Sequence, residues 1–455
     1  MPSSIIRDVV CFGPRGRLEG DCLIEDGRIV ELGRVTGSAE ETIRGEGRWL
    51  WPGAIDGHVH FREPGPTHKE DWTSGSMSAV AGGVTSVLEM PNTNPATTSA
   101  LALEQKRAIA AAKSLCNYGL FFGASPTNSA EYTRIDNVPG LKIFMGCSTG
   151  DLLVHREEDL QRVFAAFDQR IGVHAESERL LNERGALYAD RNDVAVHSII
   201  RNPETAAEAV RLACKLAIEH ERHLHILHLS TQLELDVVKA ARQQAQEEGR
   251  RTRISCEVCP HHLFLSTSAY DLMGTKVRMN PPLRDERDRE AMWQGLIDGH
   301  IDMIATDHAP HTIEEKARPY REAPSGVPGV QTMLVLMLDA AFRGLCTYEQ
   351  VLQWVCQGPA NVWGIVDRGT LEVGAFADLV LIDPHMRRKL TDTEQLSRCA
   401  WTPWAGRTLT GWPVLTLVGG RLAYRRDDDG PGEIVGSPGI GRELSFHSVE
   451  SSRAQ

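Results

Sequence analysis

The middle of the chain alternates short apolar runs, rich in β-branched residues, with stretches whose apolar residues recur at helical spacing. The clearest helix begins after Asn202, which can cap it, and Pro203, which suits its first turn. Its apolar stripe consists of Ala206, Val210, Ala213, Leu216 and Ala217. The apolar runs predict strands at Gly53–His60, Val84–Met90, Gly119–Gly123, Leu141–Phe144, Ile171–His174, Leu224–Leu229, Arg253–Val258 and Ile301–Thr306. Such strands alternating with helices predict an α/β fold, a (β/α)8 TIM-like barrel.

Both ends of the chain have a different pattern, with short strands broken by glycine. The early strands are expected at residues 9–12, 21–24 and 28–32, and a turn–strand–turn–strand pattern at 369–383. A hairpin is expected at 412–424, around Gly419-Gly420. We therefore expect residues 1–50 and 365–425 to form one small β-sandwich domain beside a barrel of residues 51–364. The Asp-, Gly- and Ser-rich tail, residues 426–455, is expected outside the core.

Composition narrows the class of protein. The 455 residues are 41% hydrophobic, enough for a large core, and the net charge of -12 argues against nucleic acid or membrane as partners. No apolar stretch is long enough for a membrane span, and the first residues do not resemble a signal peptide. The ten cysteines without a secretory signal are therefore expected to be reduced thiols in a cytoplasmic protein.

Two histidines, His58 and His60, stand at the end of the first expected barrel strand. Residues two apart on a strand point to the same side, so the two imidazoles should lie next to each other. Such a pair can hold a borderline metal such as zinc. The alternative is two unrelated histidines of core or surface.

Further polar residues fall at or near other strand ends, where barrel enzymes carry their chemistry. They are Lys142, His174, His228 and Asp307. Each has an ordinary alternative: a hydrogen-bonded core histidine, a lysine reaching the surface, or an aspartate that caps a helix. It is a poor explanation that all four residues have only such structural roles, because each lies at or near a strand end. We therefore predict that they share a metal site.

Several motifs carry a resemblance to a known family. They are Asp56-Gly-His-Val-His-Phe-Arg-Glu-Pro-Gly65, Lys69-Glu-Asp71, Met90-Pro-Asn-Thr93, Leu141-Lys-Ile-Phe-Met-Gly146, Cys256-Glu-Val258, Pro260-His-His-Leu263, Asn280-Pro-Pro-Leu-Arg284, Thr306-Asp-His-Ala-Pro-His311 and Gly374-Ala-Phe-Ala-Asp-Leu379. With these motifs in order from about Trp51 to Tyr424, the chain resembles the amidohydrolase superfamily and, within it, the dihydroorotase family of the lysine-carboxylated binuclear type.

The resemblance implies a centre of two divalent metal ions, expected to be Zn2+. His58 and His60 would hold one ion, and His174 and His228 the other. Lys142 would carry a carbamate derived from CO2 that bridges them, because a free ammonium cannot ligate a metal. Asp307 would be a ligand and the general base. The implied reaction is the reversible cyclisation of N-carbamoyl-L-aspartate to L-dihydroorotate in pyrimidine synthesis.

Substrate contacts are implied as well. Arg62 would grip the substrate carboxylate with two parallel hydrogen bonds. Family positions that contact the carboxylate or the ring correspond to Asn92, Asn280 and His311, and backbone groups of Ser325 and Gly326 would meet the ring amide. Asn92 could instead be a simple turn residue. Two positions depart from the family pattern: Cys147 replaces an expected Ser and Gln331 a common Glu.

Alternatives remain open. Allantoinase and dihydropyrimidinase (hydantoinase) share the metal set, but the allantoinase pattern lacks Arg62. A catalytically inactive homologue serving as structural partner of aspartate carbamoyltransferase would lose metal ligands, whereas this chain keeps them. Cys256 and Cys259 have the spacing of a redox or zinc motif, but no second cysteine pair accompanies them, so no separate metal is expected there. A homodimer or higher homo-oligomer is expected, association with aspartate carbamoyltransferase is open, and residues 145–153 are a candidate lid.

Overall fold

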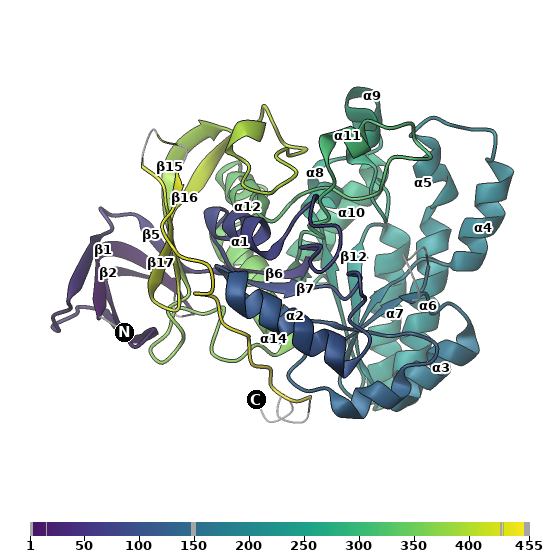
Figure 1. The fold of residues 1–455 in the computed structure, drawn as a ribbon, viewed down its shortest axis with the longest axis horizontal. Helices are drawn as coiled ribbons and strands as arrows, with labels where there is room; N and C mark the ends of the chain where they lie inside the picture. The colour runs from purple at the N-terminus through teal and green to yellow at the C-terminus, as the bar shows by residue number, and fades with distance from the viewer. Residues whose placement is uncertain (1–2, 15, 147–151, 428–429, 431, 450–455) are drawn as a thin grey trace.

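The computed structural model describes residues 3–14, 16–146, 152–427, 430 and 432–449. Its centre is built from parallel strands flanked by helices (Figure 1). A six-stranded sheet has the order β14-β13-β12-β11-β10-β9, and a three-stranded sheet the order β6-β7-β8. The bounds are β6 Ala54–Val59, β7 Val84–Glu89, β8 Asn117–Leu120, β9 Phe122–Gly123, β10 Leu141–Phe144, β11 Arg170–His174, β12 His223–Leu229, β13 Arg253–Val258 and β14 Met303–Ile304. The prediction of an α/β fold with parallel strands is confirmed.

The two parallel sheets meet at both of their sides. On one side Val59 of β6 bridges to His308, just beyond β14, and the His60 amide donates to the His308 carbonyl at 2.8 Å. On the other side β8 runs on into β9, with Phe121 between them donating its amide to the Glu89 carbonyl at 3.0 Å. The carboxyl ends of β6 and β14 are thereby held next to each other.

Helices connect the strands and cover the outside of the sheets (Figure 1). They are α1 Trp72–Ala81, α2 Ala100–Lys113, α3 Glu157–Ala166, α4 Glu178–Leu187, α5 Val196–Ile200, α6 Pro203–His220, α7 Gln232–Glu247, α8 Pro260–Phe264, α9 Ala269–Met273, α10 Glu286–Ile297, α11 Ile313–Lys316, α12 Met333–Phe342, α13 Tyr348–Leu352 and α14 Gly358–Trp363. The predicted helix α6 is confirmed: the Asn202 side chain accepts from the Thr205 amide, and the whole predicted apolar stripe is buried. No helix in the part of the chain described is long and apolar enough to cross a membrane.

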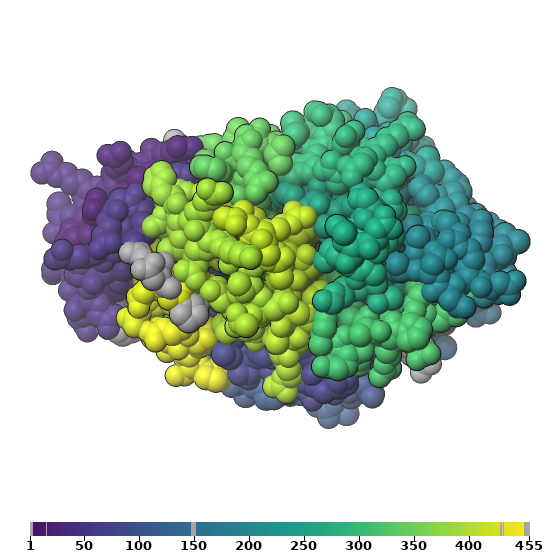
Figure 2. Space-filling view, turned by 90° about the horizontal axis from the view of Figure 1, so that it is seen from above, coloured from purple at the N-terminus to yellow at the C-terminus, as the bar shows by residue number. Residues whose placement is uncertain are grey.

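Strands from both chain ends pair in one nine-stranded sheet. Its order is β18-β17-β16-β15-β5-β1-β2-β3, with β4 beside β1. The bounds are β1 Ser4–Gly13, β2 Gly16–Glu25, β3 Arg28–Gly33, β4 Glu41–Arg44, β5 Trp49–Pro52, β15 Leu379–Lys389, β16 Thr408–Val418, β17 Arg421–Arg425 and β18 Glu433–Ile434. The predicted hairpin around Gly419-Gly420 is confirmed, whereas residues 369–383 contribute one strand, β15, instead of two. Figure 2 shows the late segments of the chain lying between its N-terminal end and its green middle part.

The composition of the tail predicts that it lies outside the core, but in the structure part of the tail packs against the core. Leu444 is fully buried and packs with Phe446 against a hydrophobic cluster that includes Phe121 and Trp363. The backbone also pairs: the Leu444 amide donates to the Tyr118 carbonyl at 2.8 Å. These two apolar side chains stabilise the docked tail because they bury apolar surface against this cluster.

Candidate active site

The predicted site residues meet in one cavity of about 340 Å³ at the carboxyl ends of the parallel strands. Its lining contains His58, His60, Arg62, Asn92, Lys142, His174, His228, Asn280, Asp307, His311, Ser325 and Gly326. These residues are far apart in sequence and come together because parallel strands place their carboxyl ends at one edge.

The first histidine pair is oriented by hydrogen bonds on its outer side. His58 Nδ1 lies 2.8 Å from a Glu257 carboxylate oxygen, and His60 Nδ1 lies 2.8 Å from the Asn92 side-chain oxygen. Both partners are acceptors, so both Nδ1 atoms carry the proton and both Nε2 atoms carry a lone pair. These Nε2 atoms lie 3.3 Å (His58) and 2.9 Å (His60) from the same oxygen, Oδ1 of Asp307. The two nitrogen lone pairs and the anionic Asp307 oxygen repel one another unless a cation lies between the nitrogens and the oxygen.

The second pair lies on neighbouring strands, with His174 at the end of β11 and His228 near the end of β12. His174 Nε2 lies 3.0 Å from a Glu176 carboxylate oxygen, and His174 Nδ1 lies 2.9 Å from His228 Nε2. The other ring nitrogen of His228, Nδ1, is buried without a hydrogen-bond partner. Ligand atoms of His58, His228 and Asp307 lie within 4.8 Å of one another, so the two pairs face one common space.

Burial keeps the imidazoles of His58, His60 and His228 neutral. It lowers the pKa of His60 to about 4 and holds the pKa values of His58 and His228 well below the ordinary value. A neutral imidazole is the form that ligates a metal. The donor set therefore fits divalent cations of the zinc class.

Lys142 lies on β10 within this space and is fully buried. The other two fully buried lysines of the described chain are paired: Lys106 donates to the Met90 carbonyl at 2.7 Å, and Lys316 donates to three backbone carbonyls. Lys142 Nζ makes no hydrogen bond. Burial lowers its pKa to about 7, so much of it is the neutral amine near neutral pH. A buried, unpartnered amine is the group that CO2 could convert to an anionic oxygen ligand.

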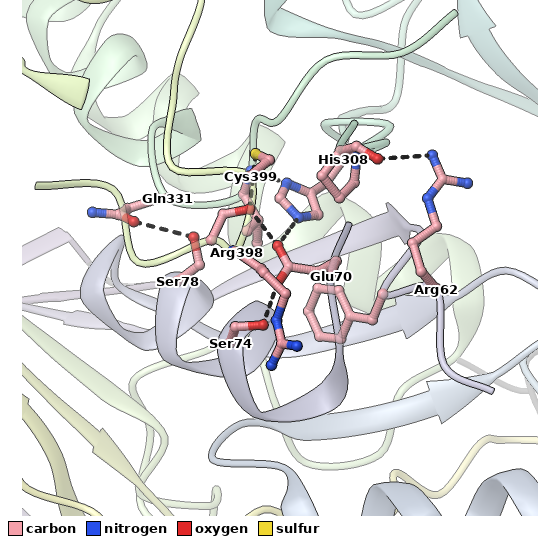
Figure 3. A network of polar contacts seen from close by, with 12 residues as sticks. Arg62, Glu70, Ser74, Ser78, His308, Gln331, Arg398 and Cys399 are labelled. Carbon is pink, nitrogen blue, oxygen red and sulfur yellow. Dashed lines mark hydrogen bonds and ion pairs between the residues drawn. The ribbon is translucent and has the colours of Figure 1, made fainter. Parts of the chain in front are cut away.

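Asp307 is held in a left-handed backbone conformation, with φ of 47°, as is His228, with φ of 40°. Non-glycine residues of this conformation concentrate at functional sites, where surrounding contacts enforce it. The next residue, His308, supplies such contacts (Figure 3). Its Nδ1 accepts from the Gly329 amide at 3.0 Å, so its Nε2 carries the proton and faces the buried Glu70 carboxylate at 3.3 Å. This network anchors the backbone that presents Asp307.

The Arg62 guanidinium reaches the cavity from just beyond β6, in a left-handed conformation with φ of 62°. Its Nη2 is 3.4 Å from His311 Nε2 and 3.5 Å from the Pro310 carbonyl, while its Nε is buried without a partner. Within the described residues, no carboxylate lies at ion-pair distance from Arg62. The guanidinium is half-buried, and it can bind an anionic ligand in the cavity.

The other predicted contacts also line the cavity wall. His197 Nε2 lies 2.9 Å from the Asn280 side-chain oxygen and orients that amide. His311 Nε2 lies 3.0 Å from the Ser325 carbonyl. The resemblance implies that backbone groups of Gly326 meet the substrate ring. In the structure the Gly326 amide donates to the Arg278 carbonyl at 2.9 Å, so this N–H is not available to the ring. Gly326 matters through its missing side chain, because a Cβ there would lie 2.4 Å from the Ala309 carbonyl oxygen.

Two carboxylates that hydrogen-bond the site histidines, those of Glu257 and Glu176, have no role in the expectations from the sequence. Glu257, on β13, contacts His58 and also His225, whose Nε2 lies 3.1 Å from its second oxygen. Glu176 is fully buried and pairs with Arg201, another residue of the cavity wall. The motif Cys256-Glu-Val258 was a signal for Glu257, since carboxylates commonly orient metal-binding histidines. No comparable signal marked Glu176.

The structure also explains one departure from the family pattern. The Gln331 side-chain oxygen accepts from the Ser78 hydroxyl at 3.1 Å (Figure 3) and from the Leu396 amide at 2.8 Å. Its amide nitrogen donates to the Glu394 carbonyl at 2.7 Å, which a carboxylate could not do. The other departure, Cys147, and most of the candidate lid lie outside the described residues.

The ends of the parallel strands bring four histidines, a lysine and an aspartate into one cavity, and this donor set could hold divalent metal ions, as in hydrolases of the metal-dependent class. The amidohydrolase family model matches residues 49–423, and the chain belongs to this family. Its curated relatives include dihydroorotases of Halobacterium salinarum, 39% identical over 93% of this chain and 97% of the relative, and of Bacillus cytotoxicus, 33% identical over 90% and 94%. A solved structure, the L-hydantoinase (dihydropyrimidinase) from Arthrobacter aurescens, matches with a TM-score of 0.90 at 28% identity, over 98% of this chain and all of that one.

Proposed function

We propose that the protein is a dihydroorotase, a cyclic amide hydrolase that interconverts L-dihydroorotate and N-carbamoyl-L-aspartate in pyrimidine synthesis. The observation that carries the choice of substrate is Arg62, a half-buried guanidinium in the cavity wall that makes no ion pair with a carboxylate of the described chain. Dihydroorotate carries a carboxylate that this cation can bind, whereas dihydrouracil and hydantoin do not. The dihydroorotase relatives support the same choice.

The donor atoms fit two divalent ions, most simply Zn2+. His58 and His60 would hold one ion and His174 and His228 the other, with Asp307 as a further ligand and a carbamate on Lys142 between the two. When bound, such ions lower the pKa of a water molecule and polarise a carbonyl. The converging lone pairs at Asp307 and the unpartnered Lys142 amine support this assignment.

The chain's own residues then account for proton movement and recognition. Arg62, with Asn92 and His311 beside it in the wall, binds the substrate carboxylate and fixes the ring. Asp307 takes a proton from the attacking water as the new C–O bond forms at the ring carbonyl. As the ring C–N bond breaks, Asp307 gives that proton to the leaving nitrogen. One water is consumed in ring opening, and the reverse sequence closes the ring.

The decisive test is an assay of the purified protein on dihydroorotate, allantoin, dihydrouracil and hydantoin. We expect turnover of dihydroorotate well above the other three, and its loss on treatment with a metal chelator. Faster turnover of dihydrouracil or hydantoin would assign the protein to the dihydropyrimidinase type. No activity on any of them, in protein with a filled metal centre, would favour a structural partner of aspartate carbamoyltransferase.

We predict two metal ions at the centre formed by His58, His60, Lys142, His174, His228 and Asp307. Anomalous scattering from crystals of the zinc-loaded protein should give two peaks there, because the two histidine pairs offer separate donor sets. A fully loaded centre with a single peak would contradict the binuclear assignment.

We predict that Lys142→Ala loses the bridge and most of the activity. Short carboxylic acids, added to the variant, should restore part of the activity because a free carboxylate can occupy the place of the carbamate. The measurement is turnover against acid concentration, with wild-type protein as the control for inhibition by the acid. Undiminished activity in Lys142→Ala would remove Lys142 from the site.

We also propose the larger organisation. The bridge between Val59 and His308 supports closure of the two parallel sheets into one (β/α)8 barrel over residues 51–364. Residues 1–50 and 365–425 would form the β-sandwich domain, and residues 426–455 a tail that docks on the barrel. A cytoplasmic homodimer or larger homo-oligomer, with possible association of aspartate carbamoyltransferase, completes the proposal.

A further inference from the structure

A second group of metal-binding side chains lies where β13 ends and α8 begins. It consists of Cys259, His261 and His262, which are 0%, 3% and 2% exposed. Ligand atoms of the three lie within 4.8 Å of one another. None of the three lines the cavity of the candidate active site. This group, the Cys259 cluster, lies behind the cavity wall, close enough for Cys259 to interact electrostatically with Asp307 and Lys142.

The tautomer of His262 is determined by its neighbour. Its Nε2 lies 3.2 Å from the Pro281 carbonyl oxygen, which can only accept, so Nε2 carries the proton. The other nitrogen, Nδ1, therefore has a lone pair, and it is buried without a hydrogen-bond partner. Metal-binding histidines commonly donate their second N–H to a backbone carbonyl in this way. His262 therefore has the backbone contact typical of a metal ligand and one ring nitrogen, Nδ1, without a hydrogen-bond partner.

Cys259 differs from the cysteine three residues earlier. The Cys256 thiol donates to the His300 carbonyl at 3.4 Å, whereas the Cys259 sulfur makes no hydrogen bond within the described residues. Burial holds the pKa values of His261 and His262 below the ordinary value, so both rings are neutral. A buried polar atom without a hydrogen-bond partner destabilises the folded state. Grouping these metal-ligand atoms of Cys259, His261 and His262 therefore destabilises the fold unless a ligand binds them.

We propose that Cys259, His261 and His262 bind a third metal ion, of the thiophilic class that includes Zn2+. One thiolate and two neutral imidazoles are the donor set of zinc sites, and a bound metal deprotonates the thiol. The sequence led us to expect no separate metal at the pair Cys256 and Cys259; in the structure two histidines, not Cys256, lie with Cys259. The ion would brace the end of β13 against Pro281, whose neighbour Asn280 lines the active-site cavity.

The test uses the full-length protein loaded with Co2+ in place of zinc. Thiolate bound to Co2+ gives a charge-transfer absorption in the near ultraviolet, and the proposed binuclear centre contains no sulfur. Wild-type protein should show this absorption, Cys259→Ser should lose it, and the matched control Cys256→Ser should keep it. In crystals of the zinc-loaded protein, a third anomalous peak should lie at the Cys259 cluster and vanish in Cys259→Ser, while the peaks near Asp307 remain.

Absence of the absorption in well-loaded wild-type protein, or its persistence in Cys259→Ser, would overturn the proposal. Its loss in Cys256→Ser alone would transfer the site to the other thiol and overturn it as well. Should Cys259→Ser not fold, His261→Gln must weaken binding of the third ion at least about 10-fold in competition with a chromophoric chelator. An unchanged affinity would count against the site. These readouts are independent of turnover, so they distinguish this proposal from the dihydroorotase assignment.

Discussion

Replacing Asp307 with Asn should lower turnover by at least about 100-fold and by up to about 10,000-fold, the range typical of a general acid–base group. The loss should be similar for every cyclic amide, because the same carboxylate takes the proton from water and returns it to the ring nitrogen. Asn keeps the size of the side chain but cannot carry that proton. The measurement is kcat on dihydroorotate in both directions, with metal content determined on the same samples.

A matched control for this variant flanks the same strand, β14, on its other side. Asp302 stands at the opposite end of β14, where it pairs with Arg242 at 2.6 Å, away from the cavity. Asp302→Asn should leave kcat close to wild type, although it can reduce stability. If Asp307→Asn retains both metal ions and near wild-type kcat, Asp307 is not the proton carrier.

Replacing Arg62 with Ala should affect substrates selectively. Removing one partner of a buried charge pair costs about 2–5 kcal/mol, a loss on the order of 30- to 5,000-fold in kcat/KM for dihydroorotate. Any weak activity on dihydrouracil should stay nearly unchanged, because that ring has no carboxylate and Arg62 does not contact the predicted metal ligands through an ion pair in the described chain. The ratio of kcat/KM values on the two substrates is the measurement.

Arg62→Lys is the companion variant. It keeps the charge but loses the two parallel hydrogen bonds, so it should recover part of the dihydroorotate activity. Equal losses on both substrates in Arg62→Ala would mean that Arg62 supports the structure of the site. The choice of dihydroorotase over its relatives with uncharged rings would then lose its main physical argument.

The sequence alone determined the local features. The spacing of His58 and His60 places both on one side of a strand because side chains alternate along it, and their rings do lie 5.3 Å apart. The cap and apolar stripe of α6 were equally readable, since both depend on residues within one or two turns. Strand ends carrying His174, His228 and Asp307 were predictable because a parallel α/β fold gathers them at one edge.

Only the tertiary structure decided how distant segments meet. It showed that Arg62 has no carboxylate within ion-pair distance in the described chain, that Lys142 is the unpartnered one of the fully buried lysines there, and that the Gly326 amide is already occupied. It also joined Cys259 to two histidines instead of Cys256, and buried Leu444 of the polar tail. Partners of this kind depend on contacts between residues far apart in sequence, which local spacing does not encode.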